Sequence, residues 1–218
     1  MNLPVYTFLK QAQPPIKTLY LKGDKQLLKS TSLKVALVGS RIISPHALKW
    51  LQLNVPALVM NGITIISGGA FGVDYNSQQI ALNHKGKVIT VIASGIENPT
   101  PKTNADFFTQ VIQNGLLISE YPGQTPASKF AFVKRNRIIA ALANLVLIVE
   151  AKEKSGALST AEFALEMGIP VACVPGRPTD ELSKGTNNLI KSGAHLVQDY
   201  NDILSLLGCD SLNLFKRS

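Results

Sequence analysis

The sequence has few of the residues that build disulfide frameworks, metal sites or membrane spans. Its 218 residues include two cysteines, Cys173 and Cys209, and three histidines. Two distant cysteines give neither a disulfide framework nor a Cys-x-x-Cys site, and the histidines lack the spacing of metal ligands. No apolar run reaches the roughly 18 residues of a membrane helix, and residues 1–15 lack a signal-peptide pattern. We therefore expect a cytoplasmic protein without metal, cofactor or membrane contact.

Acidic residues are also scarce. The chain has 14 Asp and Glu against 22 Lys and Arg, which gives a net charge of +8 and favours a polyanionic partner. The excess is concentrated in residues 1–34, which hold six lysines against Asp24 alone. A second basic segment without acids covers residues 129–137. Because scattered lysines are also typical of a solvated surface, the N-terminal ones alone do not decide the partner.

What the sequence does contain is a series of short apolar runs that alternate with segments of helical spacing. The runs lie at 34–38, 63–67, 88–93, 116–118, 145–149, 170–174 and 195–197. Strands that are apolar throughout and alternate with helices are typical of a parallel sheet covered on both faces. The expected fold class is therefore α/β, with a single doubly wound, mostly parallel sheet. A further short strand at 18–21 is expected at a sheet edge.

The chain shows no internal repeat, low-complexity segment or linker between residues 34 and 207. The expected organisation is an N-terminal arm over 1–16, one domain over 17–207 and a C-terminal tail over 208–218.

One helix boundary is marked clearly by the sequence. Ser44 and Pro45 are a suitable N-cap and first residue for a helix that runs toward Met60. Pro56 lies inside this segment and, because proline has no N–H to donate, we expect it to kink or interrupt the helix.

The feature with the clearest chemical meaning is the glycine-rich turn after the run at 63–67. Ser67-Gly68-Gly69-Ala70-Phe71-Gly72 precedes Asp74 and a helical segment. Glycines let a phosphate approach backbone N–H groups, and a helix N-terminus adds positive potential. The spacing Gly-Gly-x-x-Gly matches neither the dinucleotide fingerprint nor the Walker motif. We therefore expect a cradle for a phosphate-bearing ligand, with no support for NAD or ATP.

Several polar residues directly follow strands and should gather at one rim, beyond the carboxyl ends of the strands. They are Ser40, Arg41, Ser67, Ser94, Glu120, Glu150 and Ser155. A guanidinium at Arg41 suits a bidentate contact to phosphate or to a base edge; a structural ion pair is the alternative. Residues 129–137 combine Phe130 and Phe132 with four cations, which fits phosphates and unpaired bases. The alternative for both rings is a place in the core.

Three acidic residues keep an enzymatic interpretation open. Asp74, Glu120 and Glu150 could place two carboxylates at neighbouring strand ends, as in hydrolysis of a glycosidic or N-glycosidic bond. The sequence has no Gly-x-Ser-x-Gly elbow and no histidine near a candidate nucleophile. The alternative is that these acids neutralise Arg135 or Arg137, or cap turns of the backbone.

An ordered set of motifs resembles the DNA-processing protein A (DprA/Smf) family. The motifs are Val38-Gly39-Ser40-Arg41, Ser67 to Asp74, Lys134-Arg135-Asn136-Arg137-Ile138-Ile139-Ala140, Val149-Glu150-Ala151, Ser155-Gly156-Ala157-Leu158, Val174-Pro175-Gly176, and Gly185-Thr186-Asn187-Asn188-Leu189-Ile190 with Gly193-Ala194. Together they span about residues 17–200. The resemblance implies an extended Rossmann-like domain that binds single-stranded DNA without catalysing a reaction.

The resemblance also implies partners and site residues. Such proteins dimerise and help to load the RecA recombinase onto DNA coated by single-strand-binding protein, during natural transformation. The DNA-binding residues carried over by motif are Gly39, Ser40, Arg41, Ser67, Gly68, Gly69, Gly72, Lys129, Phe132, Arg135, Asn136, Arg137, Ser155, Gly156 and Lys191. Many members have further N-terminal helical and C-terminal winged-helix-like modules, which we expect to be absent or truncated here.

A homodimer is supported by one feature of the sequence besides the resemblance. The apolar residues Ile203, Leu204, Leu206 and Leu207 lie close to the end of the expected domain. They could form part of an interface between two copies, or they could belong to a helix that packs on its own sheet.

The alternative function is that of a nucleoside monophosphate phosphoribohydrolase resembling the cytokinin-activating LOG proteins, which share the glycine-rich parallel sheet. Those proteins use a Pro-Gly-Gly-x-Gly-Thr-x-x-Glu motif on a strand-to-helix turn. Here Ser155-Gly156-Ala157-Leu158 stands where that motif would lie. The missing motif favours DNA binding over hydrolysis.

Overall fold

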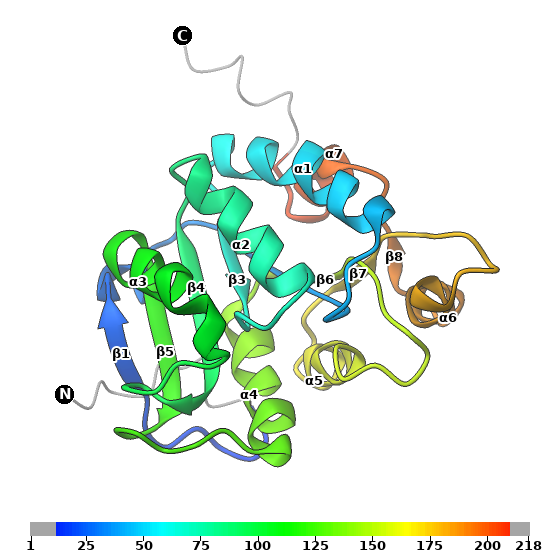
Figure 1. The fold of residues 1–218 in the computed structure, drawn as a ribbon. Helices are drawn as coiled ribbons and strands as arrows, with labels where there is room; N and C mark the ends of the chain where they lie inside the picture. Colours follow the sequence, from blue (N-terminus) through cyan, green and yellow to red (C-terminus); the bar gives the residue numbers. More distant parts are fainter. Residues whose placement is uncertain (1–11, 210–218) are drawn as a thin grey trace, which may run out of the picture.

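A computed structural model describes residues 12–209 of the chain, so parts of the predicted arm (1–11) and tail (210–218) lie outside the described residues. The described strands form one sheet in the order β1-β5-β4-β3-β2-β6-β7-β8 (Figure 1). Their bounds are Tyr20–Gly23 (β1), Lys34–Val38 (β2), Thr64–Ser67 (β3), Val88–Gly95 (β4), Leu116–Tyr121 (β5), Leu145–Ile148 (β6), Val171–Cys173 (β7) and His195–Leu196 (β8). β1 pairs antiparallel with β5, and every other pair is parallel. The predicted mostly parallel α/β sheet, with an edge strand near 18–21, is confirmed.

Helices connect the strands and cover both faces of the sheet. The α-helices are Pro45–Met60 (α1), Val73–Asn83 (α2), Ala105–Asn114 (α3), Lys129–Leu142 (α4), Leu158–Glu166 (α5), Lys184–Lys191 (α6) and Tyr200–Leu206 (α7). Short 3₁₀ helices occupy Lys25–Leu28 (η2), Lys102–Asn104 (η3) and Glu181–Ser183 (η4). One core cluster joins α1, α2, α3 and α7 to the sheet. The other joins α4, α5 and α6 to the opposite face.

Alternation of side chains along the central strands explains why both faces are covered. In β2, Val35 and Leu37 belong to one core cluster, while Ala36 and Val38 belong to the other. Successive side chains of a strand point to opposite faces, so a strand with apolar residues at every position needs a helix on each side. The same alternation holds in β6, where Leu145 and Leu147 belong to the core cluster of α1, and Val146 and Ile148 belong to the other.

The strand order places a switch point between β2 and β6. The chain proceeds from β2 outward through β3, β4 and β5 on one side, and then returns to β6, β7 and β8 on the other. The chain moves in opposite directions along the sheet after β2 and after β6, so right-handed crossovers place the connections that follow these two strands, α1 and α5, on opposite faces. Open α/β sheets bind ligands in the crevice formed at such a point.

The predicted start of α1 is confirmed, whereas the helix is not interrupted at proline. The Ser44 hydroxyl accepts a hydrogen bond from Ala47 N–H at 3.1 Å, and Pro45 is the first helical residue. The helix continues through Pro56 to Met60. Gln52, whose carbonyl would accept from the missing N–H, is exposed, so water can satisfy that carbonyl instead.

The apolar residues near the end of the domain pack onto their own sheet. Ile203 and Leu204 in α7 are buried in the core cluster of α1, and Leu206 and Leu207 pack against the same cluster. Of the two alternatives for these residues, the structure therefore shows the helix packed on its own domain. At the other end, Ala12 and Ile16 are buried in the core cluster of α4, so this part of the predicted arm is bound to the domain.

Candidate functional site

A pocket of about 500 Å³ lies beyond the carboxyl ends of β2 and β6, at the switch point of the sheet. Three chain segments form its walls: the turn after β2, the first half of α4, and the loop between β6 and α5. Of the residues predicted to bind DNA, those that line the pocket are Gly39, Ser40, Arg41, Lys129, Phe132, Arg135, Asn136, Ser155 and Gly156. The position expected for a ligand from the fold class is thus a real cavity.

The turn after β2 is held by backbone contacts to two neighbouring segments. Ser40 N–H donates to the Glu150 carbonyl at 2.9 Å, and the Ser40 carbonyl accepts from Val73 N–H at 3.1 Å. Gly72 has a φ of +77°, and a Cβ placed there would lie 2.1 Å from the Ser40 carbonyl oxygen. Only glycine permits this approach of the two loops. The backbone at Arg41 is therefore fixed, while its side chain is exposed.

Four cations surround the pocket. Arg41, Lys129, Lys152 and Lys154 line it and are exposed. Within residues 12–209, none of the four takes part in a salt bridge. The Arg41 guanidinium lies over the Phe132 ring at 4.9 Å from the centroid, a cation–π geometry. The rim thus offers positive charge and an aromatic face to an anionic ligand.

The glycine-rich turn after β3, by contrast, is closed. Ser67, Gly68, Gly69 and Gly72 are all buried, and none of them lines the pocket. Gly68 N–H donates to the Asp74 carboxylate at 3.1 Å, and Ala70 N–H also hydrogen-bonds this carboxylate. The glycines predicted a cradle for a phosphate-bearing ligand, whereas in the structure the turn binds the Asp74 carboxylate of the helix that follows.

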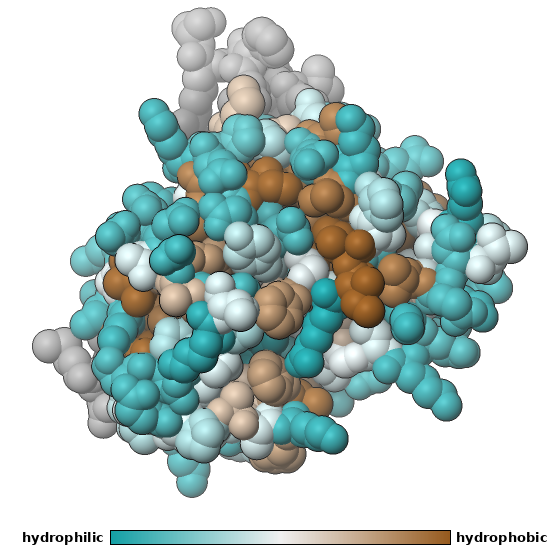
Figure 2. Space-filling model, in the orientation of Figure 1, coloured by the Kyte–Doolittle hydropathy of each residue, from teal (hydrophilic) through white to brown (hydrophobic). Residues whose placement is uncertain are grey.

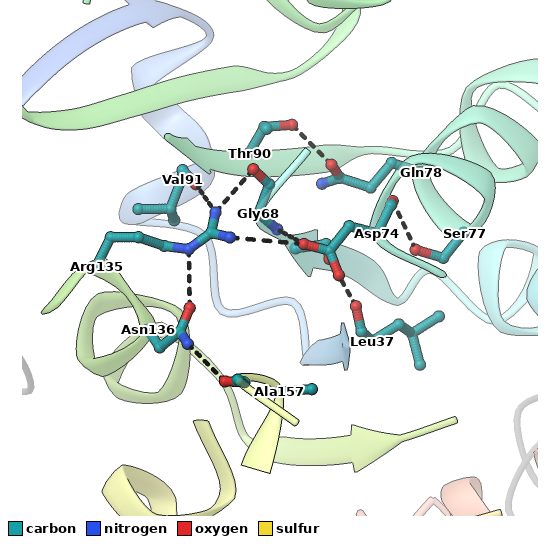
Figure 3. A network of polar contacts seen from close by, with 12 residues as sticks. Leu37, Gly68, Asp74, Ser77, Gln78, Thr90, Val91, Arg135, Asn136 and Ala157 are labelled. Carbon is teal, nitrogen blue, oxygen red and sulfur yellow. Dashed lines mark hydrogen bonds and ion pairs between the residues drawn. The ribbon is translucent and has the colours of Figure 1, made fainter. Parts of the chain in front are cut away.

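Arg135 completes this internal arrangement (Figure 3). Its guanidinium donates to the Gly68 carbonyl at 2.7 Å and to the Val91 carbonyl, and it lies 3.7 Å from the Asp74 carboxylate. A Cβ at Gly68 would overlap the guanidinium. Burial raises the pKa of Asp74 and lowers that of Arg135, and each opposite charge counteracts the shift. Arg135 therefore forms part of the pocket floor, but its guanidinium N–H groups donate to backbone carbonyls of the protein itself.

Asn136 joins the pocket floor to the loop between β6 and α5. Its side-chain oxygen accepts from Arg135 Nε at 2.8 Å, and its amide donates to the Ser159 hydroxyl at 2.8 Å and to the Gly156 carbonyl at 3.2 Å. All of these contacts are internal. Asn136 thus fixes the loop that carries Lys152 and Lys154 rather than presenting free donors.

Two predicted DNA-binding residues lie away from the pocket. Arg137 is fully buried and donates to the Glu120 carboxylate at 2.6 Å and to the Pro14 carbonyl at 2.8 Å. Lys191 ends α6, just before β8, and therefore lies toward the amino ends of the strands. A ligand in the pocket reaches neither side chain, because one is enclosed in the core and the other is at the opposite end of the sheet.

The three carboxylates of the enzymatic interpretation all have structural partners. Asp74 pairs with Arg135 and Glu120 with Arg137, as the alternative interpretation of these acids expected. Glu150 is buried and accepts from Ser44 N–H at 2.9 Å. Asp74 lines the pocket, whereas Glu120 and Glu150 do not. Each acid thus neutralises an arginine or caps a turn.

Sequence reasoning missed several residues at the pocket. Lys152 and Lys154 line it but were not among the residues carried over by motif, although they follow an apolar run directly. Their position after the strand 145–149 was a usable signal. Ile42, Val133 and Thr160 also line the pocket, and nothing in their sequence context marks them.

Two negative findings hold for residues 12–209. No helix there is long and apolar enough to cross a membrane. No three side chains of His, Cys, Asp or Glu come together in a way that could hold a metal ion.

Nearly the whole chain is similar to known proteins. The sequence model of the family described as DNA recombination-mediator protein A matches residues 4–208. The DNA processing protein DprA of Streptococcus pneumoniae is 42% identical over 188 residues, which cover 86% of this chain and 65% of that protein. Protein Smf of Synechocystis is 38% identical over 174 residues, covering 80% of this chain and 44% of that protein. The chain thus spans about half to two thirds of the length of these relatives.

A solved structure supports the same relationship. DNA processing protein A from Helicobacter pylori, studied for its single-stranded DNA binding mode, superimposes with a TM-score of 0.87 at 32% identity. The match covers 95% of this chain and 94% of that one.

Proposed function

Since the chain belongs to the DNA recombination-mediator protein A family, we propose that its pocket binds single-stranded DNA. The observation that carries the proposal is a group of four cations that surround the pocket and form no salt bridge among the described residues: Arg41, Lys129, Lys152 and Lys154. Phosphate contacts of this kind supply most of the affinity of sequence-independent binding. The relative from H. pylori, whose structure was studied for its single-stranded DNA binding mode, matches this chain over nearly its whole length.

The preference for single strands rests on Phe132. Its ring lies at the pocket beneath the Arg41 guanidinium. An unpaired base can stack on an aromatic face or on a guanidinium plane, whereas a base inside a duplex is already stacked on its neighbours. A strand with free bases therefore gains both phosphate and stacking contacts, and a duplex gains phosphate contacts alone.

Binding DNA in this way requires no catalytic group in the pocket. The carboxylates Asp74, Glu120 and Glu150 are engaged by arginines or backbone, and this supports a protein that binds DNA without catalysing a reaction. We propose the role of a recombination mediator that loads RecA onto incoming single strands in the cytoplasm during natural transformation, acting as a homodimer. Sedimentation at several protein concentrations tests the dimer, and a monomer at every concentration would contradict it.

Fluorescence anisotropy with a labelled strand tests the proposed binding. Single-stranded and duplex DNA of the same length are titrated with the protein at two salt concentrations. We expect tighter binding to the single strand and a salt slope near −0.7 for each neutralised phosphate. Equal affinity for the duplex would refute the preference, and affinity independent of salt would refute the role of the four cations.

A further inference from the structure

Exposed aromatic rings are concentrated beside the pocket. Phe71 is 49% exposed and Phe130 is 71% exposed, and no other Phe, Tyr or Trp among residues 12–209 is classed as exposed. The remaining phenylalanines of the described region are partly or fully buried, as in the pair Phe107 and Phe108 of α3. Single exposed apolar residues are ordinary on protein surfaces, so the position of these two rings is what matters.

Each of the two rings directly follows a residue that lines the pocket. Phe71 comes after Ala70, and Phe130 comes after Lys129. Eight large apolar side chains are exposed in the described part of the chain; Ile42 and Val133 line the pocket, and Phe71 and Phe130 adjoin it. Half of the exposed apolar side chains thus gather at one site. Figure 2 shows brown apolar and teal polar side chains mixed on this face of the molecule.

The two rings approach the pocket from different segments. Phe71 precedes Gly72, where an added Cβ would overlap the backbone of Ser40 and Arg41, so Phe71 is next to the turn after β2. Phe130 stands two residues before Phe132 in α4. Phe130 does not line the pocket, but Val133 does, and positions three apart are neighbours on a helix surface, so Phe130 lies next to the pocket. One ring therefore lies on the β2 side of the pocket and the other lies on the α4 side, beside Val133.

The charges around the rings identify the chemistry of the occupant. Arg41 and Lys129 lie beside the rings, and neither forms a salt bridge within residues 12–209. An apolar protein partner would leave these charges without counterions, and a free phosphate would leave the rings unused. Flat aromatic groups joined by phosphates satisfy both.

We propose that Phe71 and Phe130 are base-stacking platforms on either side of the pocket, so that the bound ligand is a run of at least three consecutive unpaired nucleotides. One base stacks at Phe132 inside the pocket, and its neighbours on the two sides stack on Phe71 and Phe130. This inference rests on the proposed function and assigns a role to two residues that are not among the DNA-binding residues carried over by motif. It also explains why two large rings remain in water in the free protein.

A strand without bases provides the decisive comparison. Anisotropy is measured with a dT oligonucleotide of about 12 nucleotides, within the length that a single-strand-binding fold covers, and with an abasic strand of the same length. The variants are Phe71→Ala, Phe130→Ala, Phe130→Leu and Phe130→Trp. Met60→Ala is the control, because Met60 is 86% exposed at the end of α1 and does not line the pocket.

We expect Phe71→Ala and Phe130→Ala each to weaken dT binding about tenfold and to leave binding of the abasic strand unchanged. Phe130→Leu should behave like the alanine variant because it lacks a ring, whereas Phe130→Trp should restore affinity. Met60→Ala should match the wild type on both strands. Thermal melting should show no loss of stability in any variant, since all of these side chains are exposed.

The possible failures are distinguishable. If the wild type binds dT and both phenylalanine variants match Met60→Ala, the stacking inference is overturned and the proposed function stands. Equal losses on the dT and abasic strands would also overturn it, because the rings would then act through something other than bases. If the wild type binds neither strand, the proposed function itself fails, and the inference fails with it.

Discussion

Two glycine turns follow neighbouring parallel strands in this protein, and their glycines have different environments. The turn after β3, Ser67–Gly72, has the stronger sequence signal for phosphate, yet two of its N–H groups, those of Gly68 and Ala70, are occupied by the carboxylate of Asp74. The turn after β2, Gly39–Arg41, has one glycine and places the exposed Arg41 at the pocket. A glycine-rich turn before a helix therefore binds some anion, and an acid in the first turn of that helix can be the anion.

The same contrast separates the arginines. Arg135 and Arg137 are buried in ion pairs that hold the fold together, whereas Arg41 is exposed and has no acidic partner among the described residues. We therefore expect mutations of the first group to affect stability and mutations of Arg41 to affect binding. The predictions below test this division, beginning with the largest expected effect.

Removal of Arg135 should cause the largest loss of stability. Arg135→Ala leaves the buried Asp74 carboxylate without its cation and removes the donors to the Gly68 and Val91 carbonyls. Breaking a buried pair in this way costs about 3–5 kcal/mol of the free energy of unfolding, which urea denaturation measures. The matched variant Arg41→Ala should change that free energy by less than about 0.5 kcal/mol. Similar losses in both would contradict the division.

A smaller loss is expected when a methyl group is added to the closed turn. In Gly68→Ala the new Cβ would overlap the Arg135 guanidinium, so the pair has to move. Overpacking of this kind costs about 1–3 kcal/mol. Gly156→Ala is the matched control in the pocket loop, because no atom lies within 4 Å of a Cβ placed there. If thermal unfolding finds Gly68→Ala as stable as Gly156→Ala, the turn after β3 is looser than the structure indicates.

Two substitutions of Arg41 should weaken binding to single-stranded DNA by different amounts. Arg41→Ala removes both the charge and the plane over Phe132, and we expect a loss of about 1–3 kcal/mol in binding to single-stranded DNA. Arg41→Lys keeps the charge but loses the stacked plane, so about 1 kcal/mol should be lost. Titration of both variants with one labelled strand measures the difference. Full affinity in Arg41→Lys would show that charge alone matters at this position.

Much of the fold could be predicted because its signals are local. Apolar strand runs such as Leu145–Ile148 and the N-cap at Ser44 depend on neighbouring residues, and the structure places both as predicted. The alternation of strands and helices also predicted where the pocket lies. Strand order beyond that depends on contacts distant in sequence and could not be derived from periodicity.

The roles of individual site residues were harder to predict, because burial depends on partners far away in the chain. Arg135 and Arg137 belong to one basic segment with Lys129, yet Arg137 meets Glu120 and Pro14 across the fold and is enclosed. The sequence left open whether the acids neutralise these arginines, and the structure shows that they do. The spacing from Gly68 to Asp74, at the start of α2, was the one local sign that the turn is occupied.

The most direct test of the account compares two double variants with the same net charge. Arg41→Ala with Lys129→Ala removes two cations from the pocket, and Lys87→Ala with Lys191→Ala removes two exposed cations near the amino ends of the strands. The affinity of each for one single strand is measured over a range of salt concentrations. We predict that the pocket pair reduces the salt slope by about 1.4, corresponding to two phosphates, while the remote pair leaves slope and affinity close to the wild type. Equal losses in the two double variants would show that net charge, and not the pocket at the switch point, binds the DNA.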